Sequence, residues 1–402
     1  MHIRDIYDAV FPILFTTACF GLSSILTTTQ NNIRKLKIFN ILRILNIIYI
    51  SLFTYLIYRA VSDFKTQQLH SSYASGVSKI GIIFQLLAQI LLIYVIYTVN
   101  ISKSVNVLSS IEDIKKIDAV FQDLGETINY NTHFMYEVVV ILVGCGAILG
   151  RAVITHLYMS KSVFSTNGTP HLILSYPSFV SYIIQNNFVL LVKLLHERFN
   201  LINKLLEHLI EEKMSENLTK IKVSQEYQLK HGLKRIELLM ELHDCLTDVG
   251  NKVNDTFTIQ ILSCFTAQFL TEVFTIFYVY YEILVLKNKV SALIWSMWTL
   301  WTTLEVFLVT ITCHLTCKES KSAGLAIHKV LMIEYDPYIK RKLMIFSQQI
   351  CHRPLQFTAC GLFSIDTSLI FTIAGAAATY LLIMLQFQEG IEAQCSNITV
   401  RY

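Results

Sequence analysis

Two stretches of the chain place cysteine, histidine and carboxylate side chains at short spacings that could support chemistry. The sequence "CHLTC" occupies 313–317 and "CH" follows at 351–352; thiolates and imidazoles are groups that bind zinc. The sequence "HDCLTD" at 243–248 sets one imidazole beside two carboxylates. The C-x-x-x-C spacing matches zinc sites poorly, and His243 has no hydroxyl or thiol nucleophile in a recognised arrangement with it. Packing and helix-interface roles are therefore favoured for both stretches.

Motifs of enzyme chemistry are missing elsewhere in the sequence. A P-loop, a G-x-S-x-G elbow and an H-E-x-x-H helix are all absent. The nine cysteines make an odd number and indicate no disulfide framework. We therefore expect that the protein is not an enzyme and that it uses no cofactor or metal.

The composition points to a membrane protein. Hydrophobic residues make up 53% of the 402 residues and charged residues only 15%, whereas soluble domains carry about 25% charged residues. The mean hydropathy is +0.49. A spanning helix needs about 20 mostly apolar residues, and seven segments qualify: 44–61, 80–99, 134–158, 172–195, 257–286, 292–315 and 365–388. We predict an all-α membrane protein with these seven transmembrane helices.

An eighth apolar stretch, "AVFPILFTTACFGLSSIL" at 9–26, precedes the first span. A signal peptide would need a basic region before it and a small-residue cleavage site after it. Only Arg4 precedes the stretch, and no clear site follows. We predict an interfacial or partly buried helix here.

The cations predict the orientation of the chain. If the N-terminus is cytoplasmic, 25 of the 33 Lys and Arg residues fall in inner segments, as the excess of cations in cytoplasmic loops requires. Seven crossings then put the C-terminus outside. The sequons at Asn167 and Asn397 fall outside and predict glycosylation, while those at Asn217 and Asn254 fall inside and should be silent. Because the net charge of +4 belongs to the inner face, it indicates no nucleic-acid partner.

The inner segments read as helical continuations of the spans. After the fourth span, apolar residues alternate at spacings of four and three, a seam that can pack on another helix: Leu195, Phe199, Ile202, Leu206 and Leu209. The stretch "LKRIELLMELHDCLTDVGNKVND" before the fifth span has a similar spacing of apolar residues. We expect an inner helical bundle at which subunits join. No internal repeat or pair of broken helices of the transporter kind is present.

The C-terminal region carries a family resemblance. The last span ends in Thr379 and Tyr380, five apolar residues, then Gln386 and Phe387. Together with "ACGLF" at 359–363 and "CHLTCKES" at 313–320, this pattern resembles the insect gustatory receptor family. The resemblance in topology covers essentially the whole chain, and the resemblance in residues is strong only after about Cys313.

The resemblance implies a ligand-gated cation channel in the plasma membrane of chemosensory neurons. It implies a homo- or hetero-tetramer with the seventh span of each subunit around a central pore, and a pocket for a small tastant that opens to the outside between the first six spans. The implied organisation is a cytoplasmic segment 1–43, a pocket-bearing part 44–317, a cytoplasmic anchor 318–364, a pore span 365–388 and an extracellular tail 389–402.

Polar residues mark one face of the last span. Ser368, Thr372, Thr379 and Gln386 are separated by four, seven and seven residues, so they drift only about 20–40° around a helix of 3.6 residues per turn. Polar groups inside a membrane usually face a protein interior or a water-filled cavity. A polar seam inside one subunit and a pore fit the pattern equally well, and the resemblance favours the pore. We predict Gln386 and Phe387 as its gate.

A ligand pocket is predicted from polar and aromatic residues in the outer halves of the spans, the mixture that binding a small polar molecule requires. Trp298 and Thr302, four residues apart on one helix face, are the main candidates. Further candidates are Gln85, Gln89, Arg151, His156, Tyr182, Gln185, Glu272 and Tyr278, with Trp295 and Trp301 as interfacial anchors.

Three other classes of protein compete with this interpretation. A G-protein-coupled receptor would have its N-terminus outside, against the cation count, and D-R-Y and N-P-x-x-Y motifs are absent. An insect odorant receptor shares the expected topology and differs in the C-terminal motif. A transporter is the third alternative. The sequence does not choose between a sugar, a bitter compound and other tastants.

Overall fold

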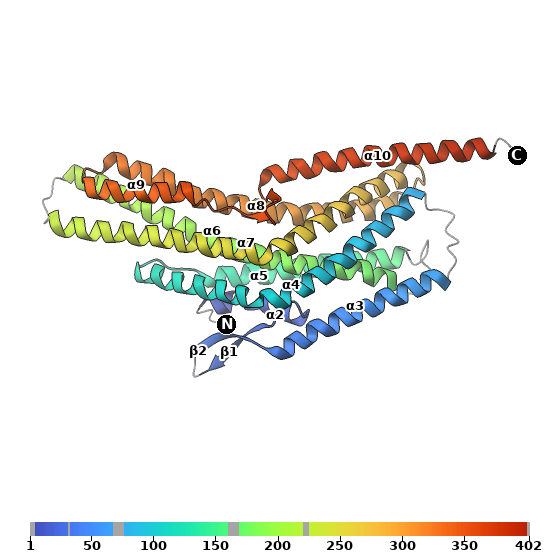
Figure 1. The fold of residues 1–402 in the computed structure, drawn as a ribbon, viewed down its shortest axis with the longest axis horizontal. Coiled ribbons are helices and arrows are strands. Elements are labelled where there is room, and N and C mark those ends of the chain that lie inside the picture. The colour runs from blue at the N-terminus through green and yellow to red at the C-terminus, as the bar shows by residue number, and fades with distance from the viewer. Residues whose placement is uncertain (1–4, 31–32, 67–75, 160–168, 220–224, 400–402) are drawn as a thin grey trace.

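Seven helices that are long and apolar enough to cross a membrane dominate the structure, a computed structural model that describes residues 5–30, 33–66, 76–159, 169–219 and 225–399. They run roughly along one axis of an elongated molecule (Figure 1). Their bounds are α3 Asn40–Thr66, α4 Gly76–Asp123, α5 Tyr130–Met159, α6 Thr169–Thr219, α7 Gln225–Leu284, α8 Lys289–Ile333 and α10 Thr367–Thr399. The predicted class, an all-α membrane protein with seven spans, is confirmed.

Several of these helices extend far beyond the predicted spans. The helix α4 continues from its apolar part to Asp123, and α7 begins at Gln225, well before the predicted start of the fifth span. The continuations of α6, α7 and α8 gather with α9 (Pro337–His352) at one end of the molecule, the left end in Figure 1. The predicted seam of α6 is buried there, from Leu195 to Leu209. The expected helical bundle outside the spans is therefore present within the single chain.

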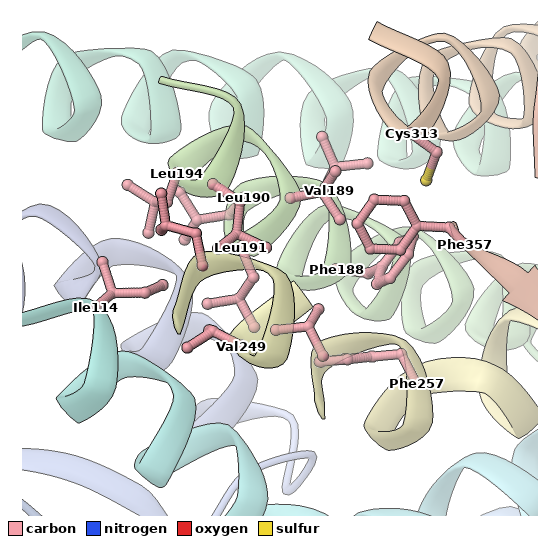
Figure 2. Close-up of a cluster of buried hydrophobic side chains, with 14 of the residues drawn as sticks. Ile114, Phe188, Val189, Leu190, Leu191, Leu194, Val249, Phe257, Cys313 and Phe357 are labelled. Carbon is pink, nitrogen blue, oxygen red and sulfur yellow. The ribbon is translucent and has the colours of Figure 1, made fainter. Parts of the chain in front are cut away.

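The helix α6 lies at the centre of the fold. In its apolar window 83% of the residues are buried, which is what a helix that is apolar all round requires. Side chains of α4, α7, α8 and the 357 region close on it, as Figure 2 shows for Ile114, Phe257, Cys313 and Phe357. The Cys313 side chain is thus part of the hydrophobic core.

The N-terminal segment forms two short helices and a hairpin. The helices α1 (Ile6–Ala9) and α2 (Phe11–Cys19) bury Ile6, Ile13 and Leu14, so the predicted partly buried helix exists but ends at Cys19. The hairpin pairs β1 (Ile25–Gln30) with β2 (Ile33–Ile38) in antiparallel register, Ile25 opposite Ile38. The sequence analysis did not predict these strands.

A short structured turn links α9 to α10. The strands β3 (Thr358–Ala359) and β4 (Phe363–Ser364) pair antiparallel. Between them Gly361 has a φ of +70° and Cys360 a φ of +54°, a left-handed conformation that glycine adopts without steric cost. Asp366 then accepts hydrogen bonds from the Ser368 amide at 2.8 Å and hydroxyl at 2.5 Å, which satisfies one of the free amide donors at the start of α10.

The helix α10 leaves this turn and runs along one side of the molecule to the C-terminus (Figure 1). Only 11% of the residues in its apolar window are buried. It continues to Thr399, beyond the expected end at 388. This helix therefore presents most of its surface outside its own chain.

Candidate functional site

A small polar cavity lies among five of the long helices, α4 to α8. Its volume is about 20 Å³, room for about one water molecule. The walls carry the charged groups Arg151 and Glu305, the indoles of Trp298 and Trp301, and the polar side chains of Gln89, Ser178, Ser181, Gln268, Thr271 and Thr302. Ionisable residues inside membrane spans are costly to bury and usually serve a function, so this cavity is the leading candidate site.

Arg151 stacks on Trp298 at one wall. The guanidinium carbon lies 3.9 Å from the centroid of the Trp298 ring, a cation–π geometry that contributes about 2 kcal/mol when it is desolvated. Both side chains are buried, with 7% exposed in each case. The aromatic face therefore partly offsets the cost of burying the arginine charge.

Glu305 also lines the cavity and is held by two donors. Its Oε2 accepts a hydrogen bond from Gln268 Nε2 at 2.6 Å, and its Oε1 accepts one from the Trp301 indole. Gln89 donates to the Thr271 hydroxyl at 3.3 Å. These bonds join α4, α7 and α8 around the cavity, so a ligand that displaced one of them would act on the packing of three helices.

Three of the eight ligand candidates predicted in the spans, namely Gln89, Trp298 and Thr302, line the cavity. The Thr302 hydroxyl donates to the carbonyl of Thr299 at 2.9 Å, within its own helix. Arg151, which the sequence also suggested, joins them. The side chain of His156 lies outside the described part of the chain.

The other five candidates are buried elsewhere and have their own partners. Gln85 donates to the Thr271 carbonyl, and Gln185 donates to Ser181 one turn earlier in the same helix. Tyr182 donates to the Val140 carbonyl at 2.7 Å. Thr303 donates to Glu272 at 2.5 Å, and Tyr278 packs against Trp295. The structure brings none of these five to the cavity wall.

Glu305 and Gln268 are lining residues that the sequence analysis missed. Glu305 is a carboxylate in the middle of the sixth predicted span, and such a residue is by itself a functional signal. Gln268 carries the same signal more weakly. Trp301, expected as an interfacial anchor, also belongs to the lining.

The predicted pore residues all lie on the free side of α10. Ser368, Thr372, Thr379 and Gln386 are exposed, and Phe387 is 66% exposed. The Thr372 and Thr379 hydroxyls donate to the carbonyls of Ser368 and Gly375 in the same helix. A polar seam buried inside one subunit, the alternative that the sequence left open, does not match this arrangement.

The stretch 243–248 has structural partners. The His243 ring is buried between Phe199 and Phe346, and its Nε2 lies 3.0 Å from the Ser320 carbonyl. Asp244 and Asp248 accept hydrogen bonds from Arg353, and these two carboxylates raise the pKa of the Arg353 guanidinium above its usual range. The interface role predicted for this stretch is what the structure contains.

The structure describes the side chain of one of the four sequon asparagines, Asn254. Asn167 lies outside the described residues, and the side chains of Asn217 and Asn397 are not among those described. Asn254 accepts a hydrogen bond from the Thr358 amide at 2.9 Å. Its amide group is thus engaged at the junction of α7 and β3.

Comparison with known proteins gives the family. The family model described as 7tm chemosensory receptor matches residues 10–391. "Putative gustatory receptor 28b" of Drosophila melanogaster is 23% identical over 96% of this chain and 86% of its own length. "Putative gustatory receptor 28a" of the same species is 25% identical over 75% of this chain and 74% of its own length. The solved olfactory receptor OR5 of Machilis hrabei with eugenol superposes with a TM-score of 0.46 at 10% identity, covering 77% of this chain and 88% of its own. The chain belongs to the 7tm chemosensory receptor family.

Proposed function

We propose that this protein is a gustatory receptor that works as a ligand-gated, non-selective cation channel opened by a small tastant. Membership of the chemosensory receptor family supports the receptor class. The observation that carries the channel is the exposed polar face of α10, formed by Ser368, Thr372, Thr379 and Gln386.

This polar face points away from the chain's own core. Among the described side chains of α10, Leu369, Ala377 and Gln388 are buried. Thr379 follows Ala377 by two residues and Gln386 precedes Gln388 by two, so these two polar residues lie about 200° around the helix from a buried one. The two threonine hydroxyls are satisfied within the helix, but an amide such as that of Gln386 needs water or protein to face.

Several copies arranged around an axis would give the polar face of α10 a shared aqueous pore. The family resemblance implies four, as a homo- or hetero-tetramer. In that arrangement Ser368, Thr372 and Thr379 line the pore, and Gln386 and Phe387 form its gate. Four phenylalanine rings can stop ions by excluding water from a constriction.

The cavity between α4 and α8 is the proposed tastant pocket, with Gln89, Trp298 and Thr302 as ligand contacts. The other five predicted candidates would act by holding the helices that form its walls: Gln85, Tyr182, Gln185, Glu272 and Tyr278. Because the closed cavity holds about one water molecule, a tastant must separate these walls. That separation supplies the difference in affinity between two states that ligand gating requires.

Replacement of Trp298 by alanine should weaken the response to ligand. An aromatic contact contributes about 0.5–1.5 kcal/mol beyond its burial, so the half-maximal ligand concentration should rise about 2- to 10-fold or more while surface expression persists. Met297→Ala is the matched control, since Met297 is adjacent and 49% exposed. An unchanged dose–response curve for Trp298→Ala would remove Trp298 from the pocket.

We propose the plasma membrane of chemosensory neurons as the location, with the N-terminus inside, the C-terminus outside, and glycans on Asn167 and Asn397. An epitope tag placed after Tyr402 should bind antibody on intact cells. Binding only after permeabilisation would reverse the orientation.

Whole-cell recording from a cell that lacks other chemosensory receptors tests the function. A tastant panel should evoke a current whose reversal potential follows the cation gradients. Uptake of a tastant without current would indicate a transporter, and a response confined to volatile odorants would indicate an odorant-receptor function.

A further inference from the structure

Arg151 is a buried cation without a hydrogen-bond partner. None of its three guanidinium nitrogens has such a partner within the part of the chain that the structure describes, although the side chain is only 7% exposed. Arginine keeps its charge at neutral pH and offers five N–H donors in a planar fork. The Trp298 ring lies against the guanidinium, whose carbon is 3.9 Å from the ring centroid. Burying an arginine charge without hydrogen-bond acceptors costs free energy, and a bound ligand that accepts its hydrogen bonds would lower that cost.

Two unused acceptors line the same cavity. The Gln268 and Gln89 side-chain oxygens are buried and unpaired among the described residues. The orientation of each amide is fixed, because Gln268 Nε2 must face the Glu305 carboxylate and Gln89 Nε2 must face the Thr271 hydroxyl, which itself donates to Ala267. The cavity wall therefore presents the charged N–H donors of Arg151 together with the neutral side-chain oxygens of Gln89 and Gln268 as acceptors.

Glu305 does not neutralise Arg151 directly. Both residues line the cavity, yet no ion pair within 4.0 Å joins them in the described residues, and both Glu305 oxygens already accept hydrogen bonds. A ligand that completes the site would therefore bring hydrogen-bond acceptors for Arg151 and donors for the two glutamine oxygens.

We propose that the tastant of this receptor is a small molecule with a carboxylate and an adjacent hydrogen-bond donor, an α-hydroxy or α-amino acid, whose carboxylate pairs with the Arg151 fork. Arginine binds a carboxylate through two parallel N–H···O bonds, and a neutral polyol would offer the Arg151 guanidinium no charged acceptor. The adjacent hydroxyl or ammonium group donates to Gln268 or Gln89. This inference rests on the proposal that the cavity is the tastant pocket.

The test uses the full-length receptor and two matched sets of probes. L-lactate and L-alanine carry the carboxylate, and lactamide and alaninamide replace it by an amide of similar size. Two readouts are taken: ligand-evoked current in receptor-null cells, and the melting temperature of the detergent-solubilised receptor, which rises with ligand by mass action whether or not a channel opens. Surface biotinylation reports the amount of each variant.

The wild type should respond to at least one carboxylate, and its amide counterpart should be at least about 30-fold weaker, as loss of one partner of a buried charge pair predicts. Arg151→Gln should weaken the carboxylate to the same degree, and Arg151→Lys should restore it only in part because lysine cannot form the fork. Arg59→Gln is the control, since Arg59 is an exposed arginine of α3.

A melting temperature raised by a carboxylate without any current would support the ligand and refute the channel. A tastant current from neutral compounds that Arg151→Gln leaves unchanged would overturn the ligand while the channel stands. If Arg151→Gln does not reach the surface, the wild-type comparison of L-lactate with lactamide decides the question. Equal responses to the two compounds would overturn the proposal. A melting temperature that neither compound raises would also overturn it.

Discussion

Replacement of Phe387 by alanine should give a receptor that conducts without ligand. The Phe387 ring is 66% exposed on α10 and lies about 100° around the helix from Gln386. In the proposed tetramer four such rings close the outer end of the pore, and a small rotation of each α10 replaces them by the Gln386 amides. Without the rings the closed state loses its apolar constriction. We expect the basal current to rise about tenfold or more relative to the ligand-evoked maximum, the change that about 1.4 kcal/mol gives.

Phe371→Ala is the matched control for this variant. Phe371 has the same side chain, lies on the same helix and is 79% exposed, but it is about four turns closer to the inner end. Its removal should leave the basal current unchanged. Gln386→Ala should alter gating or permeation at normal surface expression. If Phe387→Ala and Gln386→Ala both behave like the parent, the constriction lies elsewhere along the exposed face of α10.

Removal of the Asp118 carboxylate should be the most destabilising single change in the helical bundle outside the spans. The Arg198 side chain is fully buried, and its Nε and Nη2 donate to Asp118 at 3.0 and 2.9 Å. Tyr130 donates to the same carboxylate at 2.8 Å. Asp118→Ala therefore removes the carboxylate that accepts two hydrogen bonds from the buried Arg198 and, among the described residues, leaves only Glu197, 3.9 Å from Nη1, as a nearby negative charge; breaking a buried pair costs about 3–5 kcal/mol. We expect little receptor at the surface and a lower melting temperature in detergent.

Two further variants separate this ion pair from a general effect of lost charge. Lys116→Ala removes an exposed lysine that pairs with Asp113 at 2.9 Å, and exposed pairs contribute only about 0–1 kcal/mol. It should behave like the parent. Combined replacement of Asp118 and Arg198 by leucine and methionine should recover much of the loss, because apolar groups of similar volume can replace a buried pair. Normal melting of Asp118→Ala would show that the pair is dispensable.

The seven spans were predictable because hydropathy depends on composition alone, but their ends were not. The fifth span was expected from 257, whereas α7 begins at Gln225. A hydropathy window detects only the part of a helix that is apolar all round, and the continuation into the inner bundle is amphipathic. The hairpin β1–β2 follows a predicted helix and was missed, because a short two-stranded element has no strong periodic signal.

The candidate site was predictable only in part, for a related reason. Hydropathy places polar residues at a depth in the membrane and does not give the rotation of each helix about its axis. Trp298 and Gln89 line the cavity, whereas Gln185 donates to Ser181 of its own helix and Tyr182 donates to a carbonyl of α5. Contacts between residues far apart in sequence decide between these outcomes. The pairing of Gln268 with Glu305 is such a contact, and nothing local in the sequence specifies it.

The most direct test of the account asks whether the polar face of α10 meets water in a conducting pore. Thr379→Cys would be expressed in receptor-null cells, and a charged, membrane-impermeant thiol reagent applied from outside during a ligand-evoked current. We expect the reagent to cause an irreversible fall of the current, and this fall should be faster with ligand present. The wild type controls for the native thiols, and Tyr380→Cys controls for position, since the Tyr380 ring packs against Phe269 of the same chain at 6.0 Å. A Thr379→Cys current that the reagent leaves unchanged, with Tyr380→Cys blocked instead, would contradict the proposed pore face.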